Sequence, residues 1–108
     1  MIYELRTYEP CVGKMKALQA RFEQHTLRFF QRHGIVAVGF WTPLIGEWNN
    51  QLIYLLSYGD LAARERAWAA FDADPEWHRA KAESEKDGPL VARLHSTILK
   101  PTAFSPLK

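Results

Sequence analysis

Residues 52–58 read Leu-Ile-Tyr-Leu-Leu-Ser-Tyr, and this stretch decides the fold. Its length and its β-branched and aromatic content are typical of a strand, in which alternate side chains point to opposite faces. One face carries Leu52, Tyr54, Leu56 and Tyr58, and the other carries Ile53 and Leu55. Neither face is polar through its middle, so we expect this strand to be covered on both sides.

Patterned segments on either side of this strand give an alternating order of strands and helices. Residues 14–33 carry apolar side chains at spacings of three and four, which predicts a helix, and Gly34 suits its C-terminal cap. Asp60 and Asp74 are suitable N-caps for two further helices. The expected elements are a strand at 2–9, a helix at 14–33, strands at 35–42 and 52–58, a helix from 60 to the break at 72–73, a helix at 74–86 and a strand at 90–99.

This order of elements is the duplicated half-unit of a ferredoxin-like βαββαβ fold. The expected fold class is therefore α+β, with a four-stranded antiparallel sheet and helices on one face. The expected strand order is four, one, three, two, which makes the first and third strands central. A chain of 108 residues suits one domain, so we assign residues 1–108 to it.

The second face of such a sheet has no helices of its own. Because the third strand is apolar on both sides, this face would present a contiguous apolar patch, and such patches usually mark an interface. Two such faces related by a twofold axis close an isologous dimer. The sequence therefore predicts a homodimer that forms through the sheet face. The alternative is that these apolar residues are merely scattered over the surface.

The composition limits the classes of partner and cofactor that we expect, and it indicates a cellular compartment. Fourteen Lys and Arg residues against twelve interspersed Asp and Glu residues give a formal charge of +2 and no basic stripe, which disfavours nucleic-acid binding. The single cysteine, Cys11, excludes an internal disulfide and a metal site built from cysteines, and the four histidines lack metal-binding spacing. We predict no metal and no cofactor. The chain shows no signal-peptide pattern and no apolar run of membrane length, so a cytoplasmic location is expected.

Several short motifs, taken in order, resemble the landmarks of the NIPSNAP-domain family. These motifs are Tyr3-Glu4-Leu5-Arg6-Thr7-Tyr8, Gly39-Phe40-Trp41, Asp60-Leu61-Ala62-Ala63-Arg64, Asp74-Pro75-Glu76-Trp77, Lys100-Pro101-Thr102 and Phe104-Ser105-Pro106. The resemblance covers nearly the whole chain and implies a dimeric α/β-barrel fold. That superfamily includes cofactor-independent monooxygenases, haem enzymes and small proteins with no assigned activity. The resemblance offers no agreed catalytic residues to carry across.

Glu4 and Arg6 form the sharpest pair of candidate site residues. They stand two apart on a strand that should be central, so both side chains leave the same face. Buried charges must be paired and hydrogen-bonded, which makes a structural ion pair, within the chain or across the dimer, one interpretation. The second is an anion or carbonyl site, in which Arg6 orients a substrate and Glu4 acts as a base or as an orienting group. The third is that the pair is simply exposed.

His25 stands in the apolar stripe of the first predicted helix, where its ring would face the sheet. The stripe consists of Met15, Leu18, Phe22, His25 and Phe29. His25 is either a hydrogen-bonded core residue or a general base at the floor of a pocket between helix and sheet. Such a pocket would be lined by Tyr8, Trp41, Tyr54 and Trp68, although aromatic stripes at these spacings are usually core.

The sequence leaves three functions open. We favour a small homodimeric protein that binds a small organic molecule, partly aromatic or acidic, in a helix–sheet pocket. The second function is a cofactor-independent monooxygenase or isomerase, with His25 or Glu4 as base and Arg6 stabilising negative charge. The third is a non-catalytic interaction module whose charged strand residues only lock the dimer.

Overall fold

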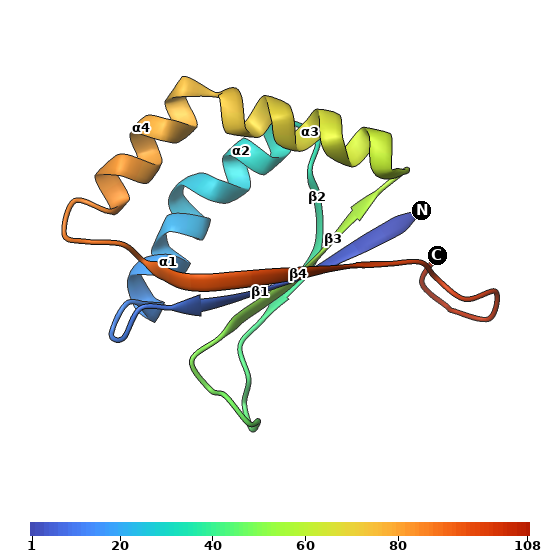
Figure 1. Cartoon of the computed structure of the whole chain (residues 1–108), viewed down its shortest axis with the longest axis horizontal. Helices are drawn as coiled ribbons and strands as arrows, with labels where there is room; N and C mark the ends of the chain where they lie inside the picture. Colours follow the sequence, from blue (N-terminus) through green and yellow to red (C-terminus); the bar gives the residue numbers. More distant parts are fainter.

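Four strands form one antiparallel sheet, and every helix lies on the same side of it (Figure 1). The computed structural model describes the whole chain, residues 1–108. The elements are β1 (Ile2–Pro10), α1 (Met15–Arg21), the π-helical turn η1 (Phe22–Thr26), α2 (Leu27–Arg32), β2 (Val36–Trp41), β3 (Leu52–Tyr58), α3 (Leu61–Ala73), α4 (Pro75–Ser84) and β4 (Val91–Leu99). The ferredoxin-like α+β prediction is confirmed, and the ends of the elements differ from the prediction by one or two residues.

The sheet has the order β2-β3-β1-β4, which is the predicted order read from its other edge. In the centre, Arg6 of β1 lies opposite Tyr54 of β3 and Ser96 of β4. Residues directly opposite each other in antiparallel strands share a face. Glu4, Arg6 and Tyr8 therefore lie on the face that the helices cover, together with the alternate residues of β3 from Leu52 to Tyr58.

The first helix is not the continuous α-helix that the sequence predicts, because η1 interrupts it. The N–H of Leu27 donates to the carbonyl of Phe22, which is the i→i+5 pattern of a π turn. The buried residues Leu18, Phe22, Thr26 and Phe30 recur every four positions. At about 100° per residue, three such steps would drift by about 120° around an α-helix. One π turn absorbs most of that drift, so all four residues face the sheet.

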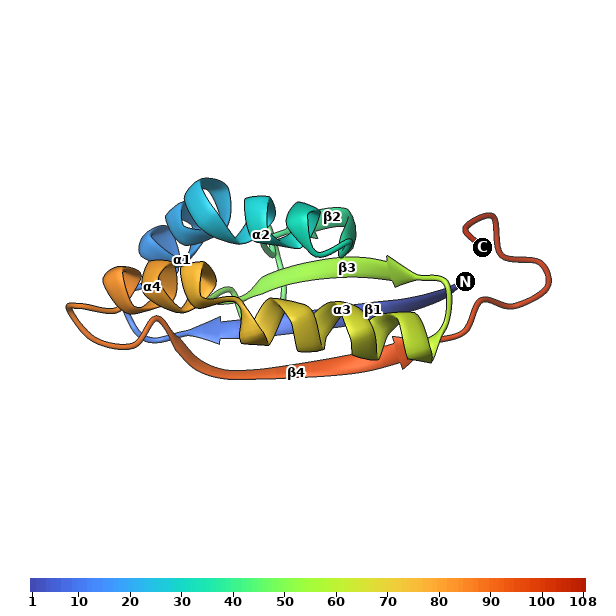
Figure 2. The ribbon, with the colours of Figure 1, turned by 90° about the horizontal axis from the view of Figure 1, so that it is seen from above.

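The helices form two arms, α1–η1–α2 and α3–α4, which lie side by side over the sheet when seen from above (Figure 2). Both predicted N-caps are confirmed: Asp60 accepts from the N–H of Ala63 at 2.8 Å, and Asp74 accepts from the N–H of Glu76 at 2.9 Å. Aromatic rings from both arms fill the space between helices and sheet around the fully buried Tyr54. None of the helices combines the length and the apolar character needed to cross a bilayer.

The opposite face of the sheet carries no helix, and large apolar side chains lie open on it. The most exposed of these are Leu5, Val36, Trp41 and Leu99. The indole of Trp41 covers Gly39, where an added Cβ would come within 2.7 Å of the ring. The pairing of β2 with β3 shifts between Ala37 and Gly39, so the ladder of this strand is irregular beside the glycine.

Candidate functional site

Glu4 is the centre of a buried charge cluster under the helices. Its side chain is 0% exposed, and four donors satisfy its two carboxylate oxygens. Tyr58 donates its hydroxyl to Oε1 at 2.6 Å, and Arg6 donates to Oε2 at 3.1 Å. Arg64 of α3 donates Nε to Oε1 at 3.0 Å and Nη2 to Oε2 at 3.1 Å. The ion pair within the chain, one of the two interpretations of Glu4 and Arg6, is therefore present.

This environment makes Glu4 a weak base. Burial acts to raise the pKa of its carboxyl group, but the hydrogen bonds from Arg64 and Tyr58 and the charge of Arg6 outweigh it and lower the pKa from 4.5 to about 2. Burial also raises the pKa of Tyr58, and its hydrogen bond to Glu4 acts in the same direction. Tyr58 therefore stays a neutral hydroxyl donor at neutral pH.

Arg6 connects this cluster to the aromatic wall of the pocket. Its Nε donates to the hydroxyl of Tyr54 at 2.7 Å, and its Nη2 donates to the hydroxyl of Tyr8 at 2.9 Å. Tyr54 in turn donates to Tyr8 at 2.9 Å. The guanidinium lies 4.6 Å from the centre of the Trp68 ring, a cation–π distance. The guanidinium of Arg6 is thus fixed by three hydrogen bonds and one ring contact, and Arg6 also lines a cavity.

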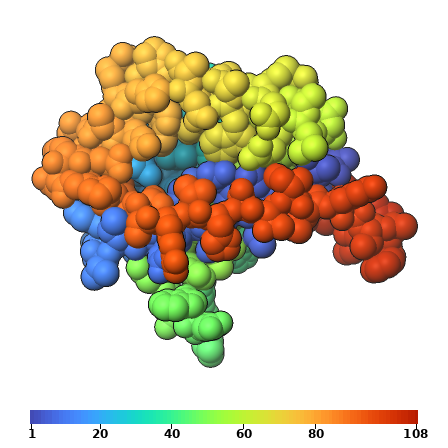
Figure 3. Space-filling view, in the orientation of Figure 1, coloured from blue at the N-terminus to red at the C-terminus, as the bar shows by residue number.

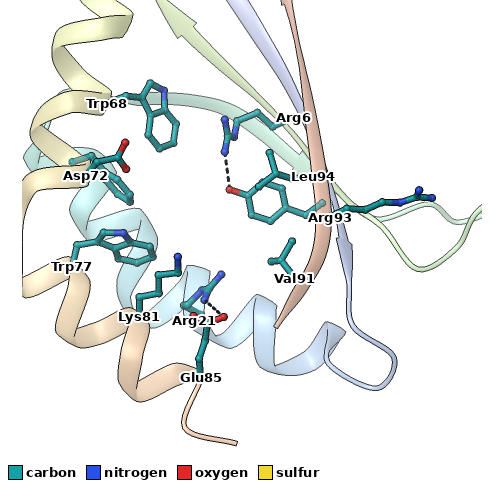
Figure 4. Close-up of a pocket in the computed structure, with 12 residues that line it drawn as sticks. Arg6, Arg21, Trp68, Asp72, Trp77, Lys81, Glu85, Val91, Arg93 and Leu94 are labelled. Carbon is teal, nitrogen blue, oxygen red and sulfur yellow. Dashed lines mark hydrogen bonds and ion pairs between the residues drawn. The ribbon is translucent and has the colours of Figure 1, made fainter. Parts of the chain in front are cut away.

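That cavity is a pocket of about 510 Å³ between the helices and the strands β1 and β4. It opens between α3, α4 and β4, where the space-filling view shows a hollow with atoms of the first helix at its bottom (Figure 3). Arg6 and Trp68 lie at one end, and Trp77, Lys81 and Arg21 lie at the other (Figure 4). The full lining is Arg6, Tyr8, Arg21, Trp68, Phe71, Asp72, Trp77, Lys81, Glu85, Val91, Arg93 and Leu94.

Arg21 is the unusual residue of this pocket, because it is a buried cation whose hydrogen bonds are incomplete. The residue is 7% exposed, and its Nε has no hydrogen-bond partner. Its Nη1 reaches only Ser84 at 3.4 Å and the carboxylate of Glu85 at 3.9 Å. Burial lowers the pKa of its guanidinium. A buried donor without a partner usually has a functional explanation.

The structure brings five of the seven predicted site residues together. Glu4, Arg6, Tyr8, Tyr54 and Trp68 form one connected hydrogen-bonded and stacked network. His25 does not line the pocket that holds Arg6, and Trp41 is 53% exposed on the open face of the sheet. Trp41 borders a separate hollow beside the loop at 43–50.

The π turn explains the position of His25. In a regular α-helix, His25 would follow Arg21 by one turn and lie on its side of the helix. The turn at Phe22–Thr26 is wider, so Thr26 takes that place. Thr26 is 4% exposed and lies toward the pocket, whereas His25 is only partly buried.

Three residues of the site were not singled out from the sequence. Arg64 and Tyr58 were assigned only to their helix and strand, although both complete the shell around Glu4. Arg21 follows Leu18 by three positions, and this spacing is the one feature of the sequence that places it on the buried side of the first helix. An arginine at such a position usually extends its charged end to water, and the sequence cannot show that this one does not.

The low pKa of Glu4 predicts a pH dependence of stability. Because its folded pKa lies below 4.5, the stabilisation from Glu4 is complete above about pH 4.5 and is lost as the pH falls toward 2. Asp74 acts in the same window, since its hydrogen bond with His33 and its contacts with Glu76 and Arg32 lower its pKa from 3.8 to about 2. We expect the urea midpoint to fall steeply below pH 4.5. The slope should be shallower in Glu4→Gln, and an equal slope in both proteins would contradict the assignment.

The chain matches the NIPSNAP family model over residues 3–106. It is similar in structure to an uncharacterized NIPSNAP-like domain protein from Burkholderia xenovorans, with 30% identity, a TM-score of 0.84 and coverage of 97% of this chain and 88% of the other. A NIPSNAP family protein from Agrobacterium tumefaciens, of unknown function, is 29% identical, with a TM-score of 0.86 and coverage of 100% and 94%. No curated protein matches this chain.

A more distant similarity shows the fold alone. A putative antibiotic biosynthesis monooxygenase from Nitrosomonas europaea superposes with a TM-score of 0.62 at 11% identity, over 94% of this chain and 98% of the other.

Proposed function

The chain belongs to the NIPSNAP family, and from that premise we propose that each subunit of a homodimer binds a small organic acid with an aromatic body in the helix–sheet pocket. The volume of about 510 Å³ is typical of pockets for small molecules. The pocket combines flat aromatic walls with buried cationic groups. This combination suits a ligand that has one charged end and one apolar body.

The incomplete hydrogen bonding of Arg21 is the observation that carries the proposal. A buried guanidinium with an unpaired Nε is unfavourable for folding, because its lost hydration is not fully replaced. A carboxylate that enters the pocket would supply the missing acceptor through a charge-assisted hydrogen bond. By contrast, Glu4 already satisfies Arg64 and one arm of Arg6, so that cluster has little left to offer a ligand.

The aromatic side chains of the pocket argue for a flat ligand body. Trp68 and Phe71 come from α3, and Trp77 comes from α4, so the walls belong to rigid elements. Their ring planes offer stacking surfaces, and stacked or edge contacts between aromatic rings add to the hydrophobic gain. Lys81 lies at the pocket with no ion-pair partner, where a cation attracts an approaching acid (Figure 4).

The two other functions open from the sequence receive less support. A monooxygenase or isomerase needs a base near the substrate, but Glu4 is a weak base and His25 does not line the pocket. An interaction module does not need the pocket, and its proposed locks, Glu4 and Arg6, lie inside the subunit rather than on the open face. We therefore favour ligand binding over catalysis or a purely structural role.

The homodimer and the location belong to the same proposal. The open sheet face and the edge strand β4, which is exposed along nearly its whole length, both leave apolar side chains uncovered, and a second copy is the occupant that we propose. The cytoplasm suits a chain whose only cysteine, Cys11, is free.

Replacement of Arg21 by methionine tests the proposed function. We expect benzoate, cinnamate and indole-3-acetate to raise the melting temperature of the wild-type protein, whereas their neutral amides should not. In Arg21→Met the affinity for the acids should fall by about 10- to 100-fold, because a hydrogen bond to a charged group is lost. Without ligand, the variant should be as stable as the wild type or more so, because an unpaired buried donor has been removed.

Arg66→Met is the matched control, since Arg66 is exposed on α3 and does not line the pocket. This variant should keep the full acid response. The proposal fails if none of the acids binds the wild-type protein at millimolar concentration. It also fails if Arg21→Met mainly destabilises the fold and keeps its affinity for acids, because Arg21 would then be a structural residue.

A further inference from the structure

A small inner cavity extends the pocket toward the first helix. It has a volume of about 40 Å³ and shares Tyr8, Arg21, Trp68, Phe71 and Trp77 with the outer pocket, so the two lie next to each other. The inner cavity adds three residues of the first helix, which are Phe22, Thr26 and Phe30. A cavity of this size holds one small polar group or a few ordered waters, because one water needs about 10–15 Å³.

Two of the three unpaired polar side-chain atoms in the core belong to the lining of this cavity. The three buried atoms without a hydrogen-bond partner are Arg21 Nε, His25 Nδ1 and Thr26 Oγ1. Arg21 and Thr26 both line the inner cavity, and they are 7% and 4% exposed. Two unsatisfied groups at one cavity are better explained by a missing common partner than by two separate defects.

The π turn is what places these two residues together. Thr26 follows Arg21 by five positions, which is about 500°, or 140° beyond a full turn, in an α-helix. Their side chains would then point to nearly opposite sides. In the π turn Phe22–Thr26 the stacked pair is i and i+5, so Arg21 and Thr26 become neighbours on one side. Single π turns inside α-helices are frequent at functional sites.

The chemistry of the cavity selects a hydrogen-bond acceptor with negative charge. Arg21 Nε can only donate, and the Thr26 hydroxyl can donate or accept. Tyr8 accepts from both Arg6 and Tyr54, so its own hydroxyl hydrogen remains to be donated. The remaining lining is aromatic and offers no acceptor except the network already formed. A guanidinium and two hydroxyl donors around a small space fit the two oxygens of a carboxylate.

We infer that the acid group of the ligand enters the inner cavity and binds Arg21 and Thr26, while its flat body fills the outer pocket between Trp68 and Trp77. This inference rests on the proposed function and adds the orientation of the ligand and its class, which is a planar aryl or unsaturated monocarboxylic acid. The acid group points toward the first helix and away from the opening. A second acid group on the far side of the ring is not needed, since Arg6 is already engaged there.

The pair Thr26→Val and Thr26→Ser tests this orientation with cinnamate as the probe. Valine keeps the shape of threonine and removes the hydroxyl, so the affinity for cinnamate measured by calorimetry should fall about tenfold. Serine keeps the hydroxyl, so Thr26→Ser should bind within about threefold of the wild type. Without ligand, both variants should melt close to the wild type, which separates loss of the hydroxyl from a general loss of packing.

The outcomes distinguish the orientation from the proposed function. If cinnamate binds the wild type and Thr26→Val equally well, the inner cavity holds water or nothing and the orientation is wrong, while the proposed function stands. If Thr26→Ser loses as much affinity as Thr26→Val, the methyl group rather than the hydroxyl matters, and the orientation is again wrong. If the wild type binds neither cinnamate nor any other acid of the panel, the proposed function itself fails.

Discussion

Replacing Glu4 by glutamine is expected to lower the free energy of unfolding by about 3–5 kcal/mol, because it leaves Arg6 without its carboxylate and Arg64 with only the exposed Glu65. Glu4 is the only carboxylate in contact with Arg6, and it receives two further hydrogen bonds from Arg64. An amide keeps the size of the side chain but can accept on one side only. Urea unfolding at pH 7, followed by circular dichroism, measures the loss.

The matched control is Glu83→Gln, which removes an ion pair with Lys86 on the surface of the protein. Exposed pairs contribute about 0–1 kcal/mol, so this variant should unfold near the wild-type midpoint. A loss below 1 kcal/mol in Glu4→Gln would contradict the assignment, because it would mean that the two arginines find water or other acceptors. The loss of stability in Tyr58→Phe should lie between the losses in Glu83→Gln and Glu4→Gln, since this variant removes a single donor to Glu4.

The sequence predicted the part of the site that follows from the alternation of strand residues. Once β1 was recognised, Glu4, Arg6 and Tyr8 had to share a face, and Tyr54 of β3 had to share it with them if the helices covered that face. The apolar residues Leu52 and Leu56 around Tyr54 pointed to the same conclusion. Alternation with a period of two predicts reliably which side chains of a strand share a face, because the pleat of a strand is regular.

The sequence could not predict the part of the site that depends on the π turn. A spacing of three or four residues fits an α-helix, and His25 satisfies that spacing with Leu18, Phe22 and Phe29. The extra residue of the turn at Phe22–Thr26 changes which side chain follows Arg21, and no local residue type announces it. The sequence therefore points to His25 as a candidate and does not point to Arg21 or Thr26, the two polar groups of the inner cavity.

Glu4 and Arg21 are both buried and charged, and they illustrate different uses of the same interior. Glu4 has as many donors as it can accept, so it contributes to the fold and offers little to a ligand. Arg21 lacks a partner for one donor and has its nearest carboxylate, from Glu85, at 3.9 Å. Natural proteins accept such unfavourable groups where function requires them. Glu4 and Arg21 are both buried, and they differ in whether their hydrogen bonds are complete. This difference distinguishes the structural residue Glu4 from the proposed binding residue Arg21.

Replacing Leu5 by glutamate is expected to dissociate the proposed homodimer, with an increase in its dissociation constant of about a thousandfold or more. Leu5 stands in the middle of a central strand, opposite Leu55, and is 36% exposed on the open face of the sheet. In an isologous dimer each substitution occurs twice, and each would bury a carboxylate without a partner at a cost of several kcal/mol. At 1.4 kcal/mol for each factor of ten, two such penalties exceed three orders of magnitude.

Sedimentation velocity over a range of concentrations measures this change. Ala69→Glu, on the exposed side of α3, adds the same charge to the helical layer and should leave the dimer intact. The folded subunit should persist in Leu5→Glu, because the new carboxylate lies in water once the partner has left. The exposed side chains of the open face, which include Val36, Trp41 and Leu99, would then be wet, so the lone subunit should also aggregate more readily than the wild type. A wild-type protein that sediments as a stable single subunit at micromolar concentration would remove the dimer from the proposal and leave the pocket to be tested by itself.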